Sequence, residues 1–287
     1  MFDRIADDPT AQQTLAEIKA GADFDAVAIA REAGNIFQNA VAQPLICAYQ
    51  TAAWAAVAPL LPKPALFAGY SVGELAAYGC AGALSAVAVV QLARTRARAM
   101  DDATATPSGL MAVRGLPVSR VEELCAASGA QIAIINAGDH FIVGGTTAAL
   151  QRVESNALAS GAVVHRLNIS VAAHTRSLAP ASTRFRSALE ASAIAAPKIP
   201  ILAGISGAAV QDRAGAITAL SRQLSTPLQW SACLDAAYER GCRMFLELGP
   251  GDALARMARE RFPELPARGI ADFRALAGVA EWVAKHR

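Results

Sequence analysis

Ser71 has a glycine two positions before it and another two positions after it, and it lies between an apolar segment and an apolar stretch expected to be helical. Residues 65–70 form a short apolar run that ends in Gly-Tyr, which is typical of a buried parallel strand. Gly-Tyr-Ser-Val-Gly (69–73) follows, and a helix is expected to begin at once at Val72. A nucleophile in such a strand–turn–helix elbow sits in a strained turn and needs small residues on both sides. We therefore predict an α/β fold with Ser71 as nucleophile; the alternative is a chance Gly-x-Ser-x-Gly in an ordinary loop.

Composition supports a large buried core and excludes several classes of protein. The chain has 287 residues, of which 54% are hydrophobic and 17% charged, so disorder is excluded and one large domain carrying a small inserted one is feasible. The formal net charge of +2 gives no indication of nucleic acid or a membrane surface as partner.

Neither a targeting segment nor a disulfide framework is expected. The alanine-rich residues 52–61 are too few to span a bilayer, and the first residues carry acids where a signal peptide carries bases. A cytoplasmic location is therefore expected. The five cysteines are odd in number and have no Cys-x-x-Cys spacing, which argues against disulfides and against a zinc site. No metal site is predicted.

A second pattern interrupts the first between residues 108 and 170. Its predicted order is strand, helix, strand, strand, helix, strand, at residues 109–115, 119–128, 131–136, 141–144, 146–160 and 162–169. This order is that of the ferredoxin-like split βαββαβ unit. Short apolar runs at 201–205 and 244–248 then resume the parallel-strand character. We predict a hydrolase-like parallel-sheet domain formed discontinuously by residues 1–107 and 171–287, with residues 108–170 as a ferredoxin-like subdomain.

A serine nucleophile needs a base, and His174 is the favoured histidine. It follows the last strand of the inserted unit, in Ser-Val-Ala-Ala-His (170–174), whose small residues leave room for an imidazole. The other three lie in a hairpin tip, in a strand and at the C-terminus: His140, His165 and His286. Glu247 is a possible third member of a triad, but a backbone carbonyl near residues 248–251 could orient the imidazole equally well. We favour a Ser–His dyad.

Four further residues are candidates for substrate binding. Arg96 lies on the helix predicted at 85–101 and could clamp a carboxylate, although its neighbours Arg94 and Arg98 are equally compatible with a solvated helix face. The backbone N–H of Val72, the residue after the nucleophile, would be an oxyanion donor. Gln43 and Asn136 are also candidates; an ordinary helix-start residue and an ordinary hairpin residue are the alternatives.

The motifs together resemble the malonyl-CoA:acyl-carrier-protein transacylase family. The resemblance rests on seven segments in order along the chain, at residues 42–45, 69–78, 95–100, 135–145, 170–174, 227–230 and 246–251. It implies that Ser71 is acylated, that His174 is the general base and that Arg96 binds the malonyl carboxylate. It further implies coenzyme A thioester as acyl donor and an acyl carrier protein thiol as acceptor, in ping-pong order with no cofactor.

Tyr70 indicates a particular branch of this family, because the members that serve fatty-acid synthesis usually carry His at this position. The sequence is therefore more similar to the acyltransferase (epsilon) subunit of malonate decarboxylase, whose other subunits would be further partners. The alternatives are a fatty-acid-synthesis transacylase, a serine thioesterase or hydrolase, and a non-catalytic subunit. The sequence leaves open which carrier protein is used, the oligomeric state and the choice between malonyl and methylmalonyl groups.

The sequence departs from the family pattern at its start. Family members begin with a strand and a Gly-Gln-Gly loop whose backbone provides a second oxyanion donor, whereas Met1 here enters directly at what should be the following helix. We expect the missing strand to be central in the sheet. A shortened chain or a protein with half its oxyanion hole would both explain the departure, and loss of one donor costs about 10²–10³ in rate.

Overall fold

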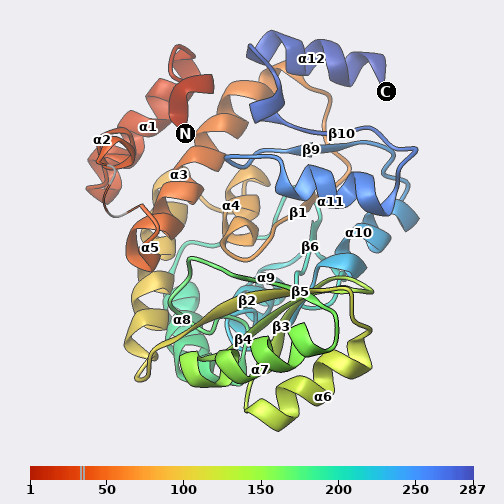
Figure 1. Cartoon of the computed structure of the whole chain (residues 1–287). Helices are drawn as coiled ribbons and strands as arrows, with labels where there is room; N and C mark the ends of the chain where they lie inside the picture. The colour runs from red at the N-terminus through yellow and green to blue at the C-terminus, as the bar shows by residue number, and fades with distance from the viewer. Residues whose placement is uncertain (33, 35) are drawn as a thin grey trace.

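The computed structural model describes residues 1–32, 34 and 36–287, which form a mixed α/β molecule (Figure 1). Its α-helices are α1 Pro9–Ala22, α2 Ala26–Arg31, α3 Asn39–Val57, α4 Val72–Cys80, α5 Ala86–Asp102, α6 Val118–Ser128, α7 Thr147–Ala159, α8 Ala179–Ala191, α9 Arg213–Arg222, α10 Trp230–Glu239, α11 Ala253–Arg261 and α12 Leu276–Lys285. Its strands are β1 Phe67–Ala68, β2 Ser108–Arg114, β3 Gln131–Ala137, β4 His140–Thr146, β5 Val163–Arg166, β6 Ile201–Leu202, β7 Ala209–Val210, β8 Leu228–Gln229, β9 Phe245–Glu247 and β10 Ala267–Gly269.

Helix α3 is the centre of the helical layer beside the parallel strands. It is apolar on almost all sides and packs against α1, α4 and α5. Alanines at this contact, such as Ala48 and Ala52, are fully buried and let the helix axes approach closely. The alternative given for Gln43, an ordinary helix-start residue, is wrong, because Gln43 lies inside this helix. The helix begins at Asn39 and Pro44 lies inside its second turn.

The small sheet confirms the predicted ferredoxin-like order. Elements β2, α6, β3, β4, α7 and β5 follow one another, and α6 and α7 pack together beside this sheet (Figure 1). The strand order is β5-β2-β4-β3-β8, with a hydrophobic core of its own around Met111, Phe141 and Val153. The fifth strand, β8, was not predicted. It comes from the C-terminal part of the chain and pairs in parallel with Ile134 and Ile135, which ties the small sheet to the larger part.

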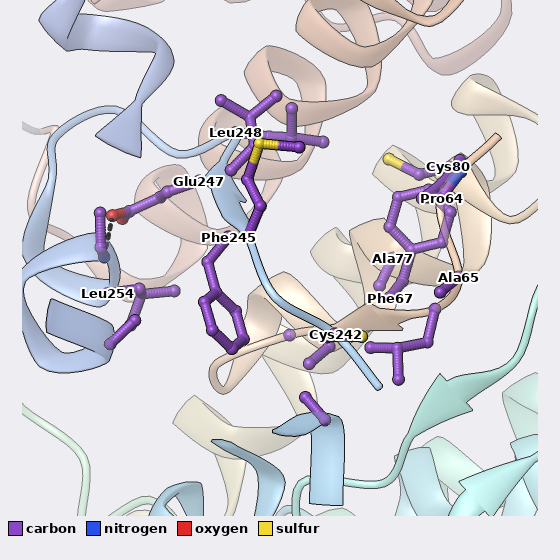
Figure 2. Close-up of a pocket in the computed structure, with 18 of the residues that line it drawn as sticks. Pro64, Ala65, Phe67, Ala77, Cys80, Cys242, Phe245, Glu247, Leu248 and Leu254 are labelled. Atoms are coloured by element: carbon purple, nitrogen blue, oxygen red, sulfur yellow. Dashed lines mark hydrogen bonds between the residues drawn. The ribbon is translucent and has the colours of Figure 1, made fainter. Parts of the chain in front are cut away.

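Outside the small sheet, the described strands fall into two separate groups. β1 pairs in parallel with β6, and β7 joins β6 antiparallel, whereas β9 pairs only with β10 among the described residues. A cavity of about 530 Å³ is lined by residues from both groups. Figure 2 shows Phe67, Ala77 and Cys80 on one side of it and Phe245 and Leu248 on the other. This is where a strand between β1 and β9 would lie, and no described strand lies there.

The α/β architecture with an inserted ferredoxin-like unit is confirmed, while the domain boundaries at 107/108 and 170/171 remain a prediction. In the part of the chain that the structure describes, no helix combines the length and the apolar character needed to cross a membrane.

The cavity generates a prediction about stability. Fusing an apolar strand of about six residues and a short glycine-containing loop ahead of Met1 should raise the melting temperature by about 4 °C or more. The added strand would pair the edges of β1 and β9 that no described strand occupies, and would bury the apolar lining. The N-terminal residues pack on the helix that borders the cavity: Phe2 contacts Tyr49 edge-on with ring centroids 5.6 Å apart, and the next residue, Gln50, lines the cavity. Differential scanning calorimetry measures the effect.

The matched control carries the same extension with its apolar residues replaced by serine. Equal melting temperatures for the two fusions and the present chain would mean that the cavity does not accept a strand.

Candidate active site

Ser71 occupies the sharp turn that the sequence predicted between β1 and α4. Its φ of 53° and ψ of −120° are strained for a residue with a side chain, which is typical of a nucleophile elbow. The turn is closed by backbone bonds from Gly73 N to the Tyr70 carbonyl and from Glu74 N to the Ser71 carbonyl, at 2.9 and 3.1 Å. A Cβ on Gly69 would lie 2.2 Å from Glu74 N and Cα, so only glycine fits there.

His174 lies against the nucleophile. Its Nε2 is 2.8 Å from Ser71 Oγ, and its Nδ1 is 2.6 Å from the backbone carbonyl of Gln223. A carbonyl can only accept, so Nδ1 carries the proton and Nε2 is free to accept the Ser71 hydroxyl proton. The backbone of His174 is also fixed: φ is 62°, and its N–H donates to the Leu224 carbonyl at 2.9 Å.

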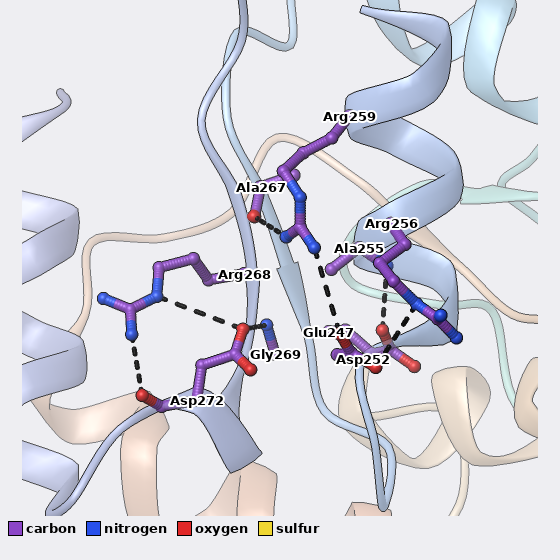
Figure 3. A network of polar contacts seen from close by, with 9 residues as sticks. All are labelled: Glu247, Asp252, Ala255, Arg256, Arg259, Ala267, Arg268, Gly269 and Asp272. Atoms are coloured by element: carbon purple, nitrogen blue, oxygen red, sulfur yellow. Dashed lines mark hydrogen bonds and ion pairs between the residues drawn. The ribbon is translucent and has the colours of Figure 1, made fainter. Parts of the chain in front are cut away.

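The histidine is oriented by a backbone carbonyl, but not by one near residues 248–251. The carbonyl belongs to Gln223, directly after α9. Glu247 is not part of a triad: its Oε2 accepts from Ala255 N at 2.8 Å at the start of α11. Figure 3 shows Glu247 in a separate polar network of β9, α11 and β10, whose other members include Asp252, Arg259 and Asp272.

Burial and charge keep the imidazole neutral. His174 is 1% exposed, and its pKa is lowered from 6.5 to about 3, first because burial penalises the cation and second because Arg96 adds positive charge nearby. A neutral imidazole with a free Nε2 can accept a proton over the whole physiological pH range.

Arg96 points into the site, unlike its neighbours on α5. It is 2% exposed, whereas Arg94 and Arg98 are exposed. One terminal nitrogen, Nη2, lies 3.4 Å from Ser71 Oγ and donates to Gln223 Oε1 at 2.9 Å. The other, Nη1, donates to Gln43 Oε1 at 2.6 Å. The alternative of a solvated helix face is therefore wrong for Arg96.

The Arg96 guanidinium stays charged without an ion-pair partner. Burial lowers its pKa to about 10, which still leaves it protonated at neutral pH. Among residues 1–32, 34 and 36–287, no carboxylate lies within ion-pair distance of it. An unpaired buried charge is costly, so a site of this kind is suited to an anionic ligand.

The three remaining predicted residues, Val72, Gln43 and Asn136, have different surroundings in the structure. Val72 begins α4 directly after Ser71, and its N–H donates to no backbone carbonyl of the described chain. Gln43 lies on α3 behind Arg96, where it accepts from the guanidinium and donates to Asn39 Oδ1 at 2.5 Å. Asn136 lies on β3 and accepts from the Tyr70 hydroxyl at 3.0 Å, on the wall beside the nucleophile.

Sequence reasoning missed two fully buried polar residues, Glu74 and Gln223. The Gln223 amide contacts Arg96, Glu74 and the Ser71 carbonyl, and its own carbonyl holds His174. Burial raises the pKa of Glu74 to about 7. The sequence did carry a signal for Glu74: it is the one charged residue in the apolar helix that follows the nucleophile, and an acid in such a setting is unusual. Gln223 carried no signal, because it follows an ordinary polar helix end.

A serine on a strand–turn–helix elbow with a neutral histidine in contact defines a serine enzyme of the acyl-transfer or hydrolase class. Comparison with known proteins is more specific. Residues 9–278 match the family model described as acyl transferase domain, and the chain belongs to this family.

Similar proteins cover nearly the whole chain. The malonyl CoA-acyl carrier protein transacylase of Mycobacterium tuberculosis is 33% identical over 272 residues, covering 91% of this chain and 88% of that protein. The protein of the same name from Escherichia coli K12 is 26% identical over 296 residues, covering 98% and 94%. The crystal structure of FabD from Acinetobacter baumannii has a TM-score of 0.94 at 28% identity, covering 100% of this chain and 94% of that one. The resemblance to the transacylases is confirmed.

The depressed pKa of His174 predicts an unusual pH profile. The active, neutral imidazole persists as the pH falls until the pH nears the folded-state pKa of about 3, so single-turnover acylation should change by less than about twofold between pH 6.5 and 5. A histidine with the ordinary pKa of 6.5 would lose about fifteenfold over the same range. Rapid-quench measurements at fixed ionic strength decide it, and a steep loss below pH 6.5 would contradict the neutral, buried base.

Proposed function

We propose that this chain moves a malonyl group from malonyl-CoA to the thiol of an acyl carrier protein, through an ester on Ser71. The observation that carries the proposal is the buried, unpaired guanidinium of Arg96, 3.4 Å from the nucleophile oxygen. A carboxylate on an acyl group carried by Ser71 would supply the missing counter-charge beside the nucleophile. The names of the relatives support the same substrate and acceptor.

The mechanism has two matched halves. His174 Nε2 takes the Ser71 proton as the oxygen attacks the thioester carbon, and the tetrahedral intermediate then expels the CoA thiolate, which receives the proton from the imidazolium. In the second half the carrier thiol gives its proton to Nε2 and attacks the serine ester, and Ser71 leaves with that proton. The Gln223 carbonyl holds Nδ1–H throughout. The chemistry proposed for these residues uses no metal or other cofactor.

The oxyanion of each tetrahedral intermediate is proposed to bind at the start of α4. The Val72 N–H is the donor next to the nucleophile, and the positive end of the helix adds to its effect. Gln43 is proposed to act by supporting Arg96, and Asn136 by fixing the Tyr70 side chain at the wall of the site.

Arg96 also separates the proposal from its rivals. A serine hydrolase would share the elbow and the histidine, but it has no need for a buried cation beside the nucleophile. A non-catalytic subunit would need neither the 2.8 Å contact between serine and histidine nor the strained backbone of Ser71. Such strain is retained where a function depends on it.

A narrower proposal concerns the carrier protein. Tyr70 stands where the fatty-acid-synthesis members of the family usually carry His, and this favours the carrier of malonate decarboxylase as acceptor. The relatives named above favour the fatty-acid-synthesis carrier at least as strongly. Transfer rates from the Ser71 ester to each purified carrier separate the two, and a preference for the decarboxylase carrier that Tyr70→His reverses would support the narrower proposal.

The acyl-enzyme itself is directly testable. Incubation with malonyl-CoA and no carrier should add one malonyl group to the tryptic peptide that contains Ser71, as measured by mass spectrometry. Ser71→Ala should show no adduct, and Ser177→Ala, a serine outside the elbow, should label as the wild type does. An adduct that persists in Ser71→Ala would contradict the assignment of the nucleophile.

Arg96 should decide the selectivity for malonyl over acetyl. Arg96→Ala should lower malonyl acylation by about ten- to a hundredfold relative to acetyl acylation, because a charge-assisted contact with the acyl carboxylate is worth about 1.5–3 kcal/mol. Single-turnover rates with malonyl-CoA and acetyl-CoA measure the ratio. Arg98→Ala, an exposed arginine on the same helix, is the control. Equal losses for both thioesters would mean that Arg96 has a structural role only.

A further inference from the structure

Gln223 is the one described residue that contacts the nucleophile's backbone, the histidine and Arg96 together. It is 0% exposed and lies directly after α9. In the sequence it is 152 positions from Ser71. Its carbonyl accepts from His174, its Oε1 accepts from Arg96 at 2.9 Å, and its Nε2 donates to the Ser71 carbonyl at 3.1 Å. Any residue at this position would offer the backbone carbonyl to His174, so the role of the Gln223 side-chain amide is a separate question.

The amide has only one orientation that satisfies its neighbours. Nε2 faces two acceptors, the Ser71 carbonyl and Glu74 Oε2 at 2.6 Å, whereas Oε1 faces the Arg96 guanidinium, which can only donate. A flipped amide would set donor against donor at Arg96 and acceptor against acceptor at Glu74. Glu74 therefore fixes which end of Gln223 meets Arg96.

Glu74 is itself held by a backbone contact that depends on a glycine. Its Oε2 also accepts from Gly204 N at 3.0 Å, and a Cβ on Gly204 would lie 2.8 Å from the same oxygen. Glu74 lies in the first turn of α4, where its backbone N–H donates to the Ser71 carbonyl, so its Cα is fixed relative to the nucleophile. The carboxylate is thus held from two sides, by Gly204 N and by Gln223 Nε2.

We propose that Glu74 and the Gln223 side chain are positioning residues that hold the Arg96 guanidinium at the nucleophile, and thereby set the preference for acyl groups that carry a carboxylate. The proposal rests on the malonyl transfer proposed above. Neither residue touches the acyl group. Gln223 supplies a neutral acceptor, which orients the cation without neutralising it, and the charge of Arg96 remains available to the substrate.

The neutral amide leads to a specific experiment. Gln223→Glu is nearly isosteric and keeps the carbonyl that holds His174. It places a carboxylate where it would pair with Arg96 in competition with the substrate, and it removes the donor to the Ser71 carbonyl and Glu74. The ratio of malonyl to acetyl acylation, from single-turnover rates, should fall about tenfold or more, with the loss chiefly in malonyl. Gln91→Glu, the same change at an exposed glutamine on the helix of Arg96, should leave the ratio as it is in the wild type.

Glu74 variants test the second half of the proposal. Glu74→Gln keeps an acceptor oxygen for Gly204 N and Gln223 Nε2, so the ratio should stay within about threefold of the wild-type value, whereas Glu74→Leu, which removes it, should lower the ratio about tenfold. A purely structural role would reduce malonyl and acetyl acylation equally in Glu74→Leu. A thermal unfolding curve for each variant shows whether the protein is folded.

Failure of the proposal can be distinguished from failure of the proposed function. A wild type that forms no malonyl adduct overturns the function, and the geometry is then tested by the crystal structure of Glu74→Leu. Displacement of Arg96 from Ser71 or reversal of the Gln223 amide supports the positioning role. An unchanged contact between Gln223 and Arg96, or a malonyl-to-acetyl ratio unchanged in both Gln223→Glu and Glu74→Leu, overturns it.

Discussion

The close contact between Gly69 and Glu74 is the constraint on which the rest of the site depends. The backbone of Gly69 approaches the first turn of α4 so closely that no Cβ fits, and Ser71 lies between the two with a positive φ of 53°. The strained turn aims Oγ away from the strand and toward His174, and places the start of a helix directly behind it. The same approach places the Glu74 carboxylate under the nucleophile, where it reaches Gly204 and Gln223.

The electrostatics of the site follow from burying three ionisable groups together. Burial raises the pKa of Glu74 to about 7 and lowers those of His174 and Arg96 to about 3 and 10. Each shift favours the neutral form, but only Arg96 remains fully charged at neutral pH. The result is a neutral base and a cation without an ion-pair partner among the described residues, both in contact with one serine. That combination is suited to an acyl donor that brings its own negative charge.

The nucleophile lies at the boundary between a well-packed region and an open one. Behind Ser71, α3, α4 and α5 pack closely, and Arg96 on α5 donates both to Gln43 on α3 and to Gln223 directly after α9. Beside it, Gly69, Tyr70 and Gly73 also line the cavity between β1 and β9. Occupancy of that cavity by a strand would therefore change the surroundings of the elbow as well as the stability of the sheet, because the same residues belong to both.

The sequence by itself determined the elements whose signals are local. The strand–turn–helix around Ser71 and the βαββαβ order could be predicted because glycine spacing and hydrophobic periodicity act over a few residues. Position after the inserted unit was enough to favour His174. The sequence could not decide whether Arg96 faced solvent or the site, since Arg94 and Arg98 on the same helix look identical to it. Nor could it identify Gln223 as the group behind the histidine, or pair β8 with β3. Those outcomes depend on residues far apart in sequence meeting in one buried place; His174 and Gln223 are 49 positions apart, and Ser71 and Gln223 are 152 apart. Only the tertiary structure decides which polar groups must satisfy one another there.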